Sequence, residues 1–408
     1  MKKFLLAVSI CSIMVCGCSS TPENSFASSV EHPDAGTAKT RNYIFDDCKI
    51  YYDRGQYEAA LKACEATYSQ GISESAIYLG DIYLFGRINN QIDVAKAVSY
   101  YESEGGVKGL YKAARVYEKG VNTDVNLPKA LSYYEKAANQ GDILSANYVA
   151  NSYLKGRAAP RDEAKAIKYF KVAADAGDPK AQFQLACFYR DGKHTVKNDD
   201  LAYVYFSKAA AQKHTEALYE KAQMEENGIG TAKNINQAIE TYRELVTRSN
   251  YTPAMYTLGK LLITTSSDEE DHNSGISFLE QASRKQYVPA KYLLGVEYIK
   301  GENVEKSTRR GIELIKECIE KGYAPAMYTF GYINERGLGV TKNDASAYAW
   351  YHIASDCGIS AADNKYQTSL SNATLLGLSK LANQKYQDYK GMYKCAKFNG
   401  PNQIFSLN

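Results

Sequence analysis

The sequence has little of what catalytic sites are usually built from. Only five histidines occur among 408 residues, and none stands in an HExxH context or beside another at metal-ligand spacing. A P-loop, a G-x-S-x-G nucleophile motif and a dinucleotide fingerprint are all missing, and no CxxC spacing suggests zinc or redox chemistry. We therefore expect no catalytic residue, no metal and no cofactor, and predict that the protein is not an enzyme.

An excess of one charge is missing as well. The chain carries 49 Lys and Arg against 46 Asp and Glu, a formal net charge of +3, whereas proteins that bind nucleic acid usually present a strongly basic face. Beyond the first 15 residues no stretch approaches the ~18 apolar residues of a membrane-spanning helix. We therefore expect no nucleic-acid partner, and contact with a membrane only through a lipid anchor.

The N-terminus has the pattern of a bacterial export signal. Two lysines precede an apolar stretch over residues 4–15, which is shorter than the about 20 residues that a spanning helix needs. It ends in Val15-Cys16-Gly17-Cys18, which resembles the lipobox of bacterial lipoproteins. The resemblance implies a lipoprotein signal peptide over residues 1–17 and lipidation of Cys18 with acyl chains such as palmitate. Because Ser19 rather than Asp follows, it also implies an outer-membrane anchor facing the periplasm; a plain signal peptide with an incidental Cys18 is the alternative.

A repeated pattern is the strongest signal in the sequence. An aliphatic–small pair is followed after three residues by an aromatic and after three more by a glycine, as in Leu79-Gly80, Tyr83 and Gly86. The pattern occurs eight times in all, this first copy included, at spacings of 34 to 37 residues. The fifth and sixth copies are degenerate. A second aromatic or large apolar pair and its trailing small residues, such as Tyr169-Phe170 and Ala173-Ala174, complete a stripe of helical period. Each copy predicts one helical hairpin, in which a small residue of the first helix leaves room for a ring of the second.

The full repeat pattern resembles the Sel-one-like repeat (SLR) family. It consists of Ala-x-x-x-Leu-Gly-x-x-Tyr-x-x-Gly, a loop with Asn or Asp, and then Ala-x-x-Tyr-Tyr/Phe-x-x-Ala-Ala-x-x-Gly. Residues 181–213 and 326–358 match this order best. The resemblance, which extends to tetratricopeptide repeats, implies an all-α fold. We expect a right-handed α-solenoid (superhelix) of about eight helix-turn-helix repeats over residues 75–358. The matching positions are packing positions, so they indicate a fold and say little about chemistry.

The ends of a solenoid need modified units, because each terminal repeat has only one neighbour. Residues 41–74 predict an N-terminal helical cap and residues 359–395 predict C-terminal capping helices. The apolar stripe expected to close the last repeat consists of Leu375, Leu378, Leu381 and Ala382. Residues 18–40 have the composition of a flexible tether, and residues 396–408 predict a loose tail.

Six of the nine cysteines lie beyond the signal region, in a chain predicted to reach an oxidising compartment. Two pairs, one at each end of the fold, are possible disulfides: Cys48 with Cys64, and Cys357 with Cys395. Cys187 and Cys318 lie three repeats apart, too far to meet in a solenoid. We expect both to be small buried apolar residues.

Tyrosine is unusually frequent, with 35 residues, and many tyrosines fall in two columns of the repeat. One column belongs to the repeat pattern and is expected in the core. The other lies near the start of each first helix, which lines the concave face in such solenoids; its members are Tyr111, Tyr219, Tyr256, Tyr292 and Tyr328. These rings predict concave-face binding of a peptide or a sugar, since each offers apolar area and a hydroxyl. The alternative is that this column also packs between repeats.

Acidic residues are the remaining candidates for chemistry. The run from Asp268 to Asp271 predicts either a cation site or a solvated loop. An enzymatic site would have to draw on acids such as Glu225, Glu226 and Glu335, whose context is that of ordinary helix-surface residues.

The leading hypothesis is a non-catalytic scaffold or adaptor, anchored by lipid in the bacterial cell envelope, that docks an envelope protein in its concave groove. The alternatives are an exopolysaccharide-secretion lipoprotein with a polysaccharide partner, resembling the alginate export scaffold, and a secreted host-interaction factor. A cell-wall enzyme is the alternative from another class of protein.

Overall fold

The computed structural model of the protein describes residues 37–396, 403–405 and 407, with side chains from residue 45 onward. All regular structure in this part of the chain is helical, in twenty helices. The predicted signal peptide and Cys18 lie outside the described residues, as does the predicted tether except for its last four residues, which begin the first helix. Among the helices described, none combines the length and the apolar character needed to cross a bilayer.

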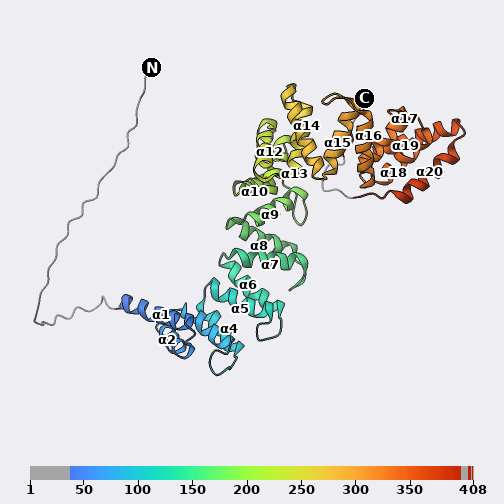
Figure 1. Ribbon diagram of the computed structural model, residues 1–408. Coiled ribbons are helices and arrows are strands. Elements are labelled where there is room, and N and C mark those ends of the chain that lie inside the picture. Colours follow the sequence, from blue (N-terminus) through green and yellow to red (C-terminus); the bar gives the residue numbers. More distant parts are fainter. Residues whose placement is uncertain (1–36, 397–402, 406, 408) are drawn as a thin grey trace, which may run out of the picture. The chain divides into compact units, whose positions relative to one another are not determined.

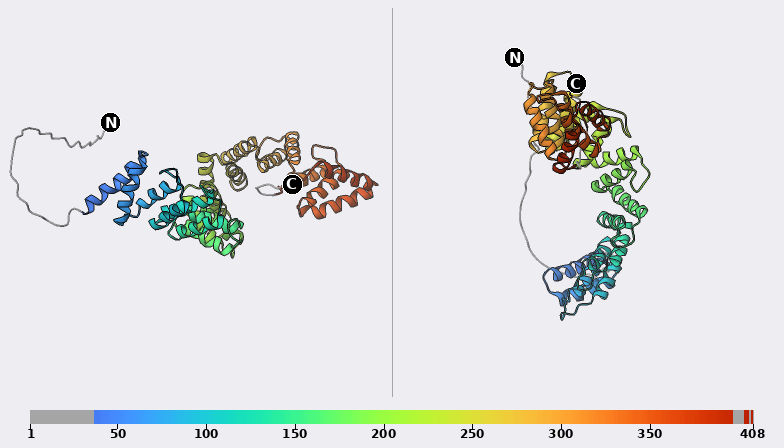
Figure 2. Two further views of the ribbon diagram at one scale, coloured as in Figure 1. Left: turned by 90° about the horizontal axis from the view of Figure 1, so that it is seen from below. Right: turned by 90° about the vertical axis from the view of Figure 1, so that its right-hand side faces the viewer.

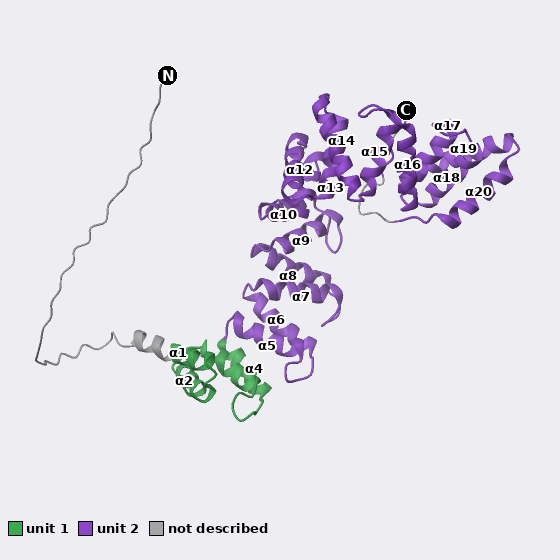
Figure 3. Cartoon of the chain, viewed as in Figure 1, with its two compact units in different colours: residues 1–104 green, residues 105–408 purple. Residues whose placement is uncertain are grey.

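The described chain divides into two compact units, of which the first ends at Glu104 and the second begins at Gly105 (Figure 3). Unit 1 consists of two helical hairpins. Their helices are α1 (Thr37–Asp53), α2 (Tyr57–Ser69), α3 (Ser75–Leu84) and α4 (Val94–Glu104).

Unit 2 consists of eight further hairpins, α5/α6 to α19/α20 (Figure 1). Their helices are α5 (Val107–Lys119), α6 (Leu127–Asn139), α7 (Ile143–Lys155), α8 (Glu163–Asp175), α9 (Pro179–Asp191), α10 (Asp199–Ala211), α11 (Thr215–Asn227), α12 (Ile235–Ser249), α13 (Thr252–Thr265), α14 (Glu269–Arg284), α15 (Val288–Lys300), α16 (Thr308–Glu320), α17 (Ala324–Arg336), α18 (Asp344–Asp356), α19 (Ala361–Leu375) and α20 (Ser379–Met392). Within unit 2 each helix packs on the next along the chain, so its hairpins stack in sequence order (Figure 2). The all-α repeat solenoid predicted from the period is confirmed.

Asparagine side chains start the second helices of several hairpins. Asn126, Asn234 and Asn343 each accept a hydrogen bond from a backbone N–H of the first turn and thus cap these helices. For α10 the cap is Asn198 rather than its neighbour Asp199. Asp199 lies instead inside the first turn, where a carboxylate also interacts favourably with the helix dipole.

The two helices of a hairpin approach most closely at the small residue of the repeat pattern. In α17/α18 the missing side chain of Gly331 leaves space for the ring of Tyr351, and a methyl group at that position would lie 2.8 Å from a ring carbon. In α3/α4 the ring of Tyr101 covers Gly80 in the same way. The prediction that a small residue makes room for a ring is therefore confirmed in these hairpins.

Neighbouring hairpins of unit 2 are joined by a hydrogen bond that recurs in the same register. A long side chain at the end of one second helix donates to the backbone carbonyl at the end of the preceding second helix. The two examples, each 35 residues apart, are Gln212 to Gly177 (2.8 Å) and Lys285 to Asn250 (2.9 Å). These bonds satisfy carbonyls that a helix end leaves without an intrahelical partner.

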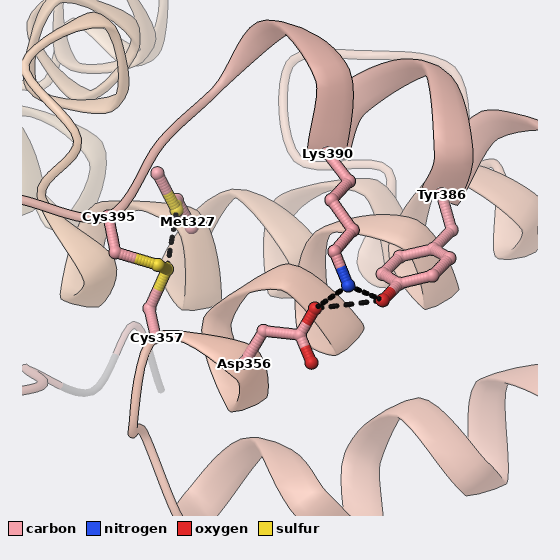
Figure 4. Close-up of a disulfide and its surroundings, with 6 residues drawn as sticks. All are labelled: Met327, Asp356, Cys357, Tyr386, Lys390 and Cys395. Carbon is pink, nitrogen blue, oxygen red and sulfur yellow. Dashed lines mark hydrogen bonds and ion pairs between the residues drawn. A yellow bond between two sulfur atoms is a disulfide. The ribbon is translucent and has the colours of Figure 1, made fainter.

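Disulfides close both ends of the fold, within the two cysteine pairs singled out from the sequence. Cys48 of α1 is bonded to Cys64 of α2. Cys357, directly after α18, is bonded to Cys395, just beyond α20 (Figure 4). Cys187 and Cys318 are free thiols, half-buried and buried, and burial raises their pKa values to about 11 and about 12.

A polar cluster holds α20 on α18 beside the second disulfide (Figure 4). The Tyr386 hydroxyl donates to Asp356 at 2.8 Å, and the Lys390 ammonium lies 3.0 Å from the same carboxylate. Lys390 also donates to the Tyr386 hydroxyl at 2.7 Å. The C-terminal hairpin is thus attached both covalently and by a charge-assisted network.

The apolar stripe predicted for the C-terminal cap is wrong for its three leucines. Gly377, with a φ of +70°, interrupts the helix that the sequence predicts here. The following helix, α20, turns the buried Ala382 and Tyr386 toward the core instead. The leucines that remain exposed are Leu375, Leu378 and Leu381.

We predict that Gly331→Ala destabilises the protein, although alanine is the better helix former by about 1 kcal/mol. The added methyl group overlaps the Tyr351 ring, and overpacking of a filled core typically costs about 1–3 kcal/mol. Gly391→Ala in α20 is the matched control, because nothing lies within 4 Å of a methyl group there. Urea unfolding of both variants measures the difference, and equal stability of the two would contradict the packing argument.

Candidate protein-binding groove

Two sets of rings on the first helices interlock from one hairpin to the next. One set is the predicted tyrosine column together with Phe183. The other set consists of the residues that precede the first helices: His214, Tyr251, Tyr287 and Tyr323. The contacting pairs, with their centroid distances, are Phe183–His214 (4.8 Å), Tyr219–Tyr251 (5.4 Å), Tyr256–Tyr287 (5.6 Å) and Tyr292–Tyr323 (5.4 Å). The column therefore builds the seams between hairpins, as the alternative interpretation of the sequence proposed.

Burial separates the five tyrosines of the column. Tyr256 is 1 % exposed, so its ring is not open to a ligand, and its assignment as a binding residue is corrected. Tyr292 is 0 % exposed, and the Phe405 ring of the C-terminal tail lies against it, so its assignment stays a prediction. Tyr111, Tyr219 and Tyr328 are only half-buried. Each of these three packs one side on a tyrosine of its own hairpin's second helix and keeps part of its surface accessible.

Sequence reasoning missed the tyrosines that precede the first helices. They stand in a Tyr-x-Pro pattern that recurs every 36 residues, in Tyr251-Thr252-Pro253, Tyr287-Val288-Pro289 and Tyr323-Ala324-Pro325. The proline lies in the first turn of each helix, where its missing N–H costs nothing. The tyrosine two positions earlier at the same spacing was the signal that could have revealed this second set of rings.

A groove of about 750 Å³ crosses the first helices of three successive hairpins, α9, α11 and α13. We call it the first-helix groove. Its aromatic lining consists of Phe183, Tyr219, Tyr251, Tyr256 and Tyr287. Its polar lining includes Arg190, Glu216, Glu220, Gln223, Glu226 and Lys260. The groove therefore combines apolar ring surface with hydrogen-bonding groups, the mixture typical of a protein-binding surface.

The charges of the groove largely neutralise one another. Arg190 forms an ion pair of 2.7 Å with Glu220, and hydrogen bonds to Asp191 and Glu220 raise the pKa of the guanidinium. Glu226 accepts a hydrogen bond of 3.0 Å from the Tyr242 hydroxyl, and Lys260 approaches it to 4.0 Å. A ligand of neutral, partly aromatic character suits such a surface better than a strongly charged one.

The acids considered for catalysis have structural partners. Glu225 is buried and accepts hydrogen bonds from Lys221 (2.6 Å) and the Tyr203 hydroxyl (2.9 Å). Glu335 accepts one from the Tyr351 hydroxyl at 2.6 Å. Together with the Glu226–Tyr242 bond, these contacts show acids that stabilise the helix packing, rather than the ordinary surface acids expected from sequence.

The acidic run forms the first turn of α14 and is not a loop. Asp268 caps the helix by accepting from the Glu270 N–H at 3.1 Å, and Asp271 pairs with Arg243 at 3.2 Å. Negative charge at a helix N-terminus is favourable in itself. The part of the chain that the structure describes holds no group of three or more His, Cys, Asp or Glu arranged to bind a metal ion.

The C-terminal tail packs against unit 2, whereas the sequence predicted a loose segment. Ile404, Phe405 and Leu407 are half-buried against its hydrophobic core. The backbone N–H of Phe405 donates to the Tyr292 hydroxyl at 3.2 Å. Three apolar side chains within four residues explain why this segment finds a partner surface.

The Sel1 repeat family matches more than half of this chain, over seven segments. They are residues 73–103, 107–142, 143–178, 179–214, 215–243, 288–323 and 324–359. Residues 244–287 have no match, although they complete one hairpin, α11/α12, and form the next, α13/α14. The degenerate sixth copy of the repeat thus keeps the hairpin fold.

Two solved structures share the fold. One is a protective antigen present in uropathogenic Escherichia coli strains that displays an SLR fold, with 22% identity, a TM-score of 0.57, and coverage of 89% of this chain and 81% of the other. The second is a Sel1 repeat protein from Oxalobacter formigenes, with 22% identity, a TM-score of 0.53, and coverage of 86% and 97%. No curated protein is significantly similar in sequence.

We predict that the stability of the protein falls as the pH rises from about 10 to 12, in part through Tyr287. Burial raises the pKa of Tyr287 to about 12, whereas an unfolded tyrosine titrates near 10. The stabilisation is therefore complete below pH 10 and is lost as the pH approaches the folded pKa.

Tyr287→Phe should lessen this loss by up to about 1 kcal/mol, allowing for partial exposure. Urea unfolding at pH 8, 10 and 11 compares the variant with the wild type. A parallel decline in the two proteins would show that the Tyr287 hydroxyl titrates normally.

Proposed function

The chain belongs to the Sel1 repeat family, and we propose that it is a non-catalytic interaction scaffold that docks a protein partner in the first-helix groove. Sel1 repeat proteins are protein-interaction scaffolds. The observation that carries the proposal is the groove itself, which runs over three consecutive hairpins and exposes parts of Tyr219, Tyr251 and Tyr287.

The composition of the groove supports a protein ligand. Partly exposed tyrosines give large contact area with little loss of side-chain entropy, and they are enriched among the residues that dominate binding energy. Gln223 adds an adaptable amide, which donates to the Tyr219 hydroxyl at 3.2 Å. A segment of an envelope protein could place apolar side chains on the rings and pair its backbone with these polar groups.

The contacts of the acids and rings argue against the other candidate functions. A cell-wall enzyme needs acids that reach a common pocket, and Glu225, Glu226 and Glu335 are held by tyrosines of the helix packing. A polysaccharide would need open ring faces for stacking. The burial of Tyr256 removes one of the five rings that the sequence offered for that purpose, and Tyr292 is covered by Phe405.

We further propose that the scaffold is anchored at the bacterial outer membrane through acyl chains on Cys18 and faces the periplasm. The lipobox-like Val15-Cys16-Gly17-Cys18 and the following Ser19 support this location. Two or three acyl chains anchor a protein durably, because each buried methylene contributes about 0.8 kcal/mol.

A photo-cross-linking amino acid at Gln223 is expected to capture a discrete envelope protein in living cells, because this side chain lines the groove. The control position is Leu201, an exposed residue of α10 outside the groove lining. Cross-linked adducts are resolved by electrophoresis and identified by mass spectrometry. No adduct at Gln223, or the same adducts from both positions, would count against docking in the groove.

Cys18→Ser should abolish incorporation of labelled palmitate and release the protein from the membrane fraction. Cys16→Ser is the matched control, since it changes the neighbouring cysteine while leaving the predicted lipid acceptor in place. Retention of the Cys18→Ser protein in the membrane fraction would refute the anchor.

A further inference from the structure

Three contacts position the chain directly after α20 on the surface of unit 2. The disulfide to Cys357 fixes Cys395, and the backbone N–H of Ala396 donates to the Gly322 carbonyl at 3.1 Å. Any side chain at Gly322 would collide with the Lys394 carbonyl, whereas the equivalent Gly141 and Gly177 have open space around them. The turn between α16 and α17 is thus adapted to the passage of this strand of chain.

The end of the tail then binds the first-helix side of α15 and α17. The Phe405 ring lies 5.9 Å from the Tyr292 ring, and its N–H donates to the Tyr292 hydroxyl. That hydroxyl also forms a 2.7 Å hydrogen bond with the Thr329 hydroxyl. One tyrosine therefore binds both the backbone and the side chain of the tail, which is how peptide ligands are commonly recognised: the main chain supplies hydrogen bonds and side chains fill apolar sites.

The surface under the tail continues into the first-helix groove. Tyr219, two hairpins earlier in the same column, makes the equivalent bond to Thr257 at 3.0 Å, and no ring of the described tail residues is stacked on it as Phe405 is on Tyr292. Phe405 packs against the same hydrophobic cluster as Tyr219, Tyr251 and Tyr287. The hydroxyl of Tyr256, between these positions, has no hydrogen-bond partner. One end of the surface is thus occupied and the other is open.

The tail fits its site only in part. A cavity of about 330 Å³ remains between Ile404, Phe405 and Leu407 on one side and α17 and α19 on the other. Lys365 and Arg336 line this cavity along with Tyr328 and Tyr332. Such an incompletely packed contact is stable when ligand and site belong to one chain, because a short linker gives the ligand an effective concentration of roughly millimolar. The tail is therefore a ligand that a better-fitting segment can displace.

We propose that Ile404, Phe405 and Leu407 form an intramolecular ligand that competes with the protein partner for the surface on α15 and α17. This inference rests on the proposed scaffold function and specifies it. The partner's recognised element is an extended segment with an aromatic residue and aliphatic residues spaced like Ile404, Phe405 and Leu407. Its aromatic residue takes the place of Phe405 on Tyr292, and the rest of the segment extends along the open groove.

The test uses the full chain and a fluorescein-labelled peptide with the sequence of residues 401–408. Phe405→Ala should bind this peptide at least tenfold more tightly than the wild type in fluorescence anisotropy, because tenfold corresponds to a site occupied by the tail about 90% of the time. Met392→Ala, which changes an exposed residue of α20, is the control and should bind like the wild type. Leu407→Ala provides a second, milder opening of the site, and circular dichroism verifies that each variant is folded.

A second pair of variants tests the hydroxyl that accepts the backbone N–H. In the Phe405→Ala background, Tyr292→Phe should weaken peptide binding several-fold. Tyr153→Phe removes a tyrosine hydroxyl that bonds to Glu135 at 2.6 Å and lines neither the groove nor the tail site, and it should leave binding unchanged. Equal effects of the two substitutions would show that the peptide does not use the Tyr292 hydroxyl.

The inference would be overturned if the folded Phe405→Ala and Leu407→Ala variants bound the peptide with the same affinity as the wild type. It would also be overturned if none of these proteins bound the peptide. Cross-linking at Gln223 separates this result from the scaffold function. An adduct whose yield is unchanged by Phe405→Ala leaves the scaffold standing and refutes competition by the tail. An adduct yield that rises severalfold in Phe405→Ala supports both the scaffold function and competition by the tail. Peptide binding without any adduct at Gln223 refutes the scaffold function but not the tail site.

Discussion

The close approach of two helices at one small residue is the constraint on which the rest of the structure depends. Where the first helix has glycine, a ring or branched side chain of the second helix fills the space, as Tyr351 does over Gly331 and Leu279 over Gly259. In the hairpins with alanine at this position, such as Ala114 and Ala150, that alanine is fully buried. Interiors pack at crystal-like density, so this contact gives each hairpin a similar outline and allows it to stack on the next.

The polar chemistry of the core follows from the same contact. A buried hydroxyl needs a partner, and in three hairpins whose covering ring is a tyrosine the residue four positions after the small one provides it. In α3/α4 the Tyr101 hydroxyl donates to Asp81 instead. The three pairs are Tyr134 with Glu118, Tyr242 with Glu226 and Tyr351 with Glu335. Where the covering residue lacks a hydroxyl, that position holds other side chains: Leu154 opposite Phe170, Arg190 opposite Phe206, Ile263 opposite Leu279 and Ile299 opposite Ile315. The acids that resemble catalytic candidates therefore belong to the packing, and one consequence is that Arg190 is free to line the groove.

The repeat period predicts most of this architecture because the same contacts recur every 36 residues. The hairpins, the helix starts at Asn126, Asn234 and Asn343, and the small-residue contacts all follow from the pattern. Features that occur once could not be derived in this way. The seat of the tail on Tyr292 depends on where a nonrepeated segment meets the surface, and the face that α20 turns inward depends on the break at Gly377. The groove could be predicted only in part: three of its five aromatic rings lie at positions of the column seen in the sequence, and two belong to the overlooked Tyr-x-Pro pattern.

The two disulfides have a consequence for how the array loses its structure. Repeat arrays loosen from their ends, because a terminal unit is stabilised by one neighbour only. Here Cys48–Cys64 closes the first hairpin and Cys357–Cys395 ties the last one to α18. Fraying from either terminus is therefore suppressed, and the first cooperative opening is shifted to interior hairpins. The first-helix groove lies on such interior hairpins, from α9/α10 to α13/α14, so the proposed partner binds where the array opens rather than at its closed ends.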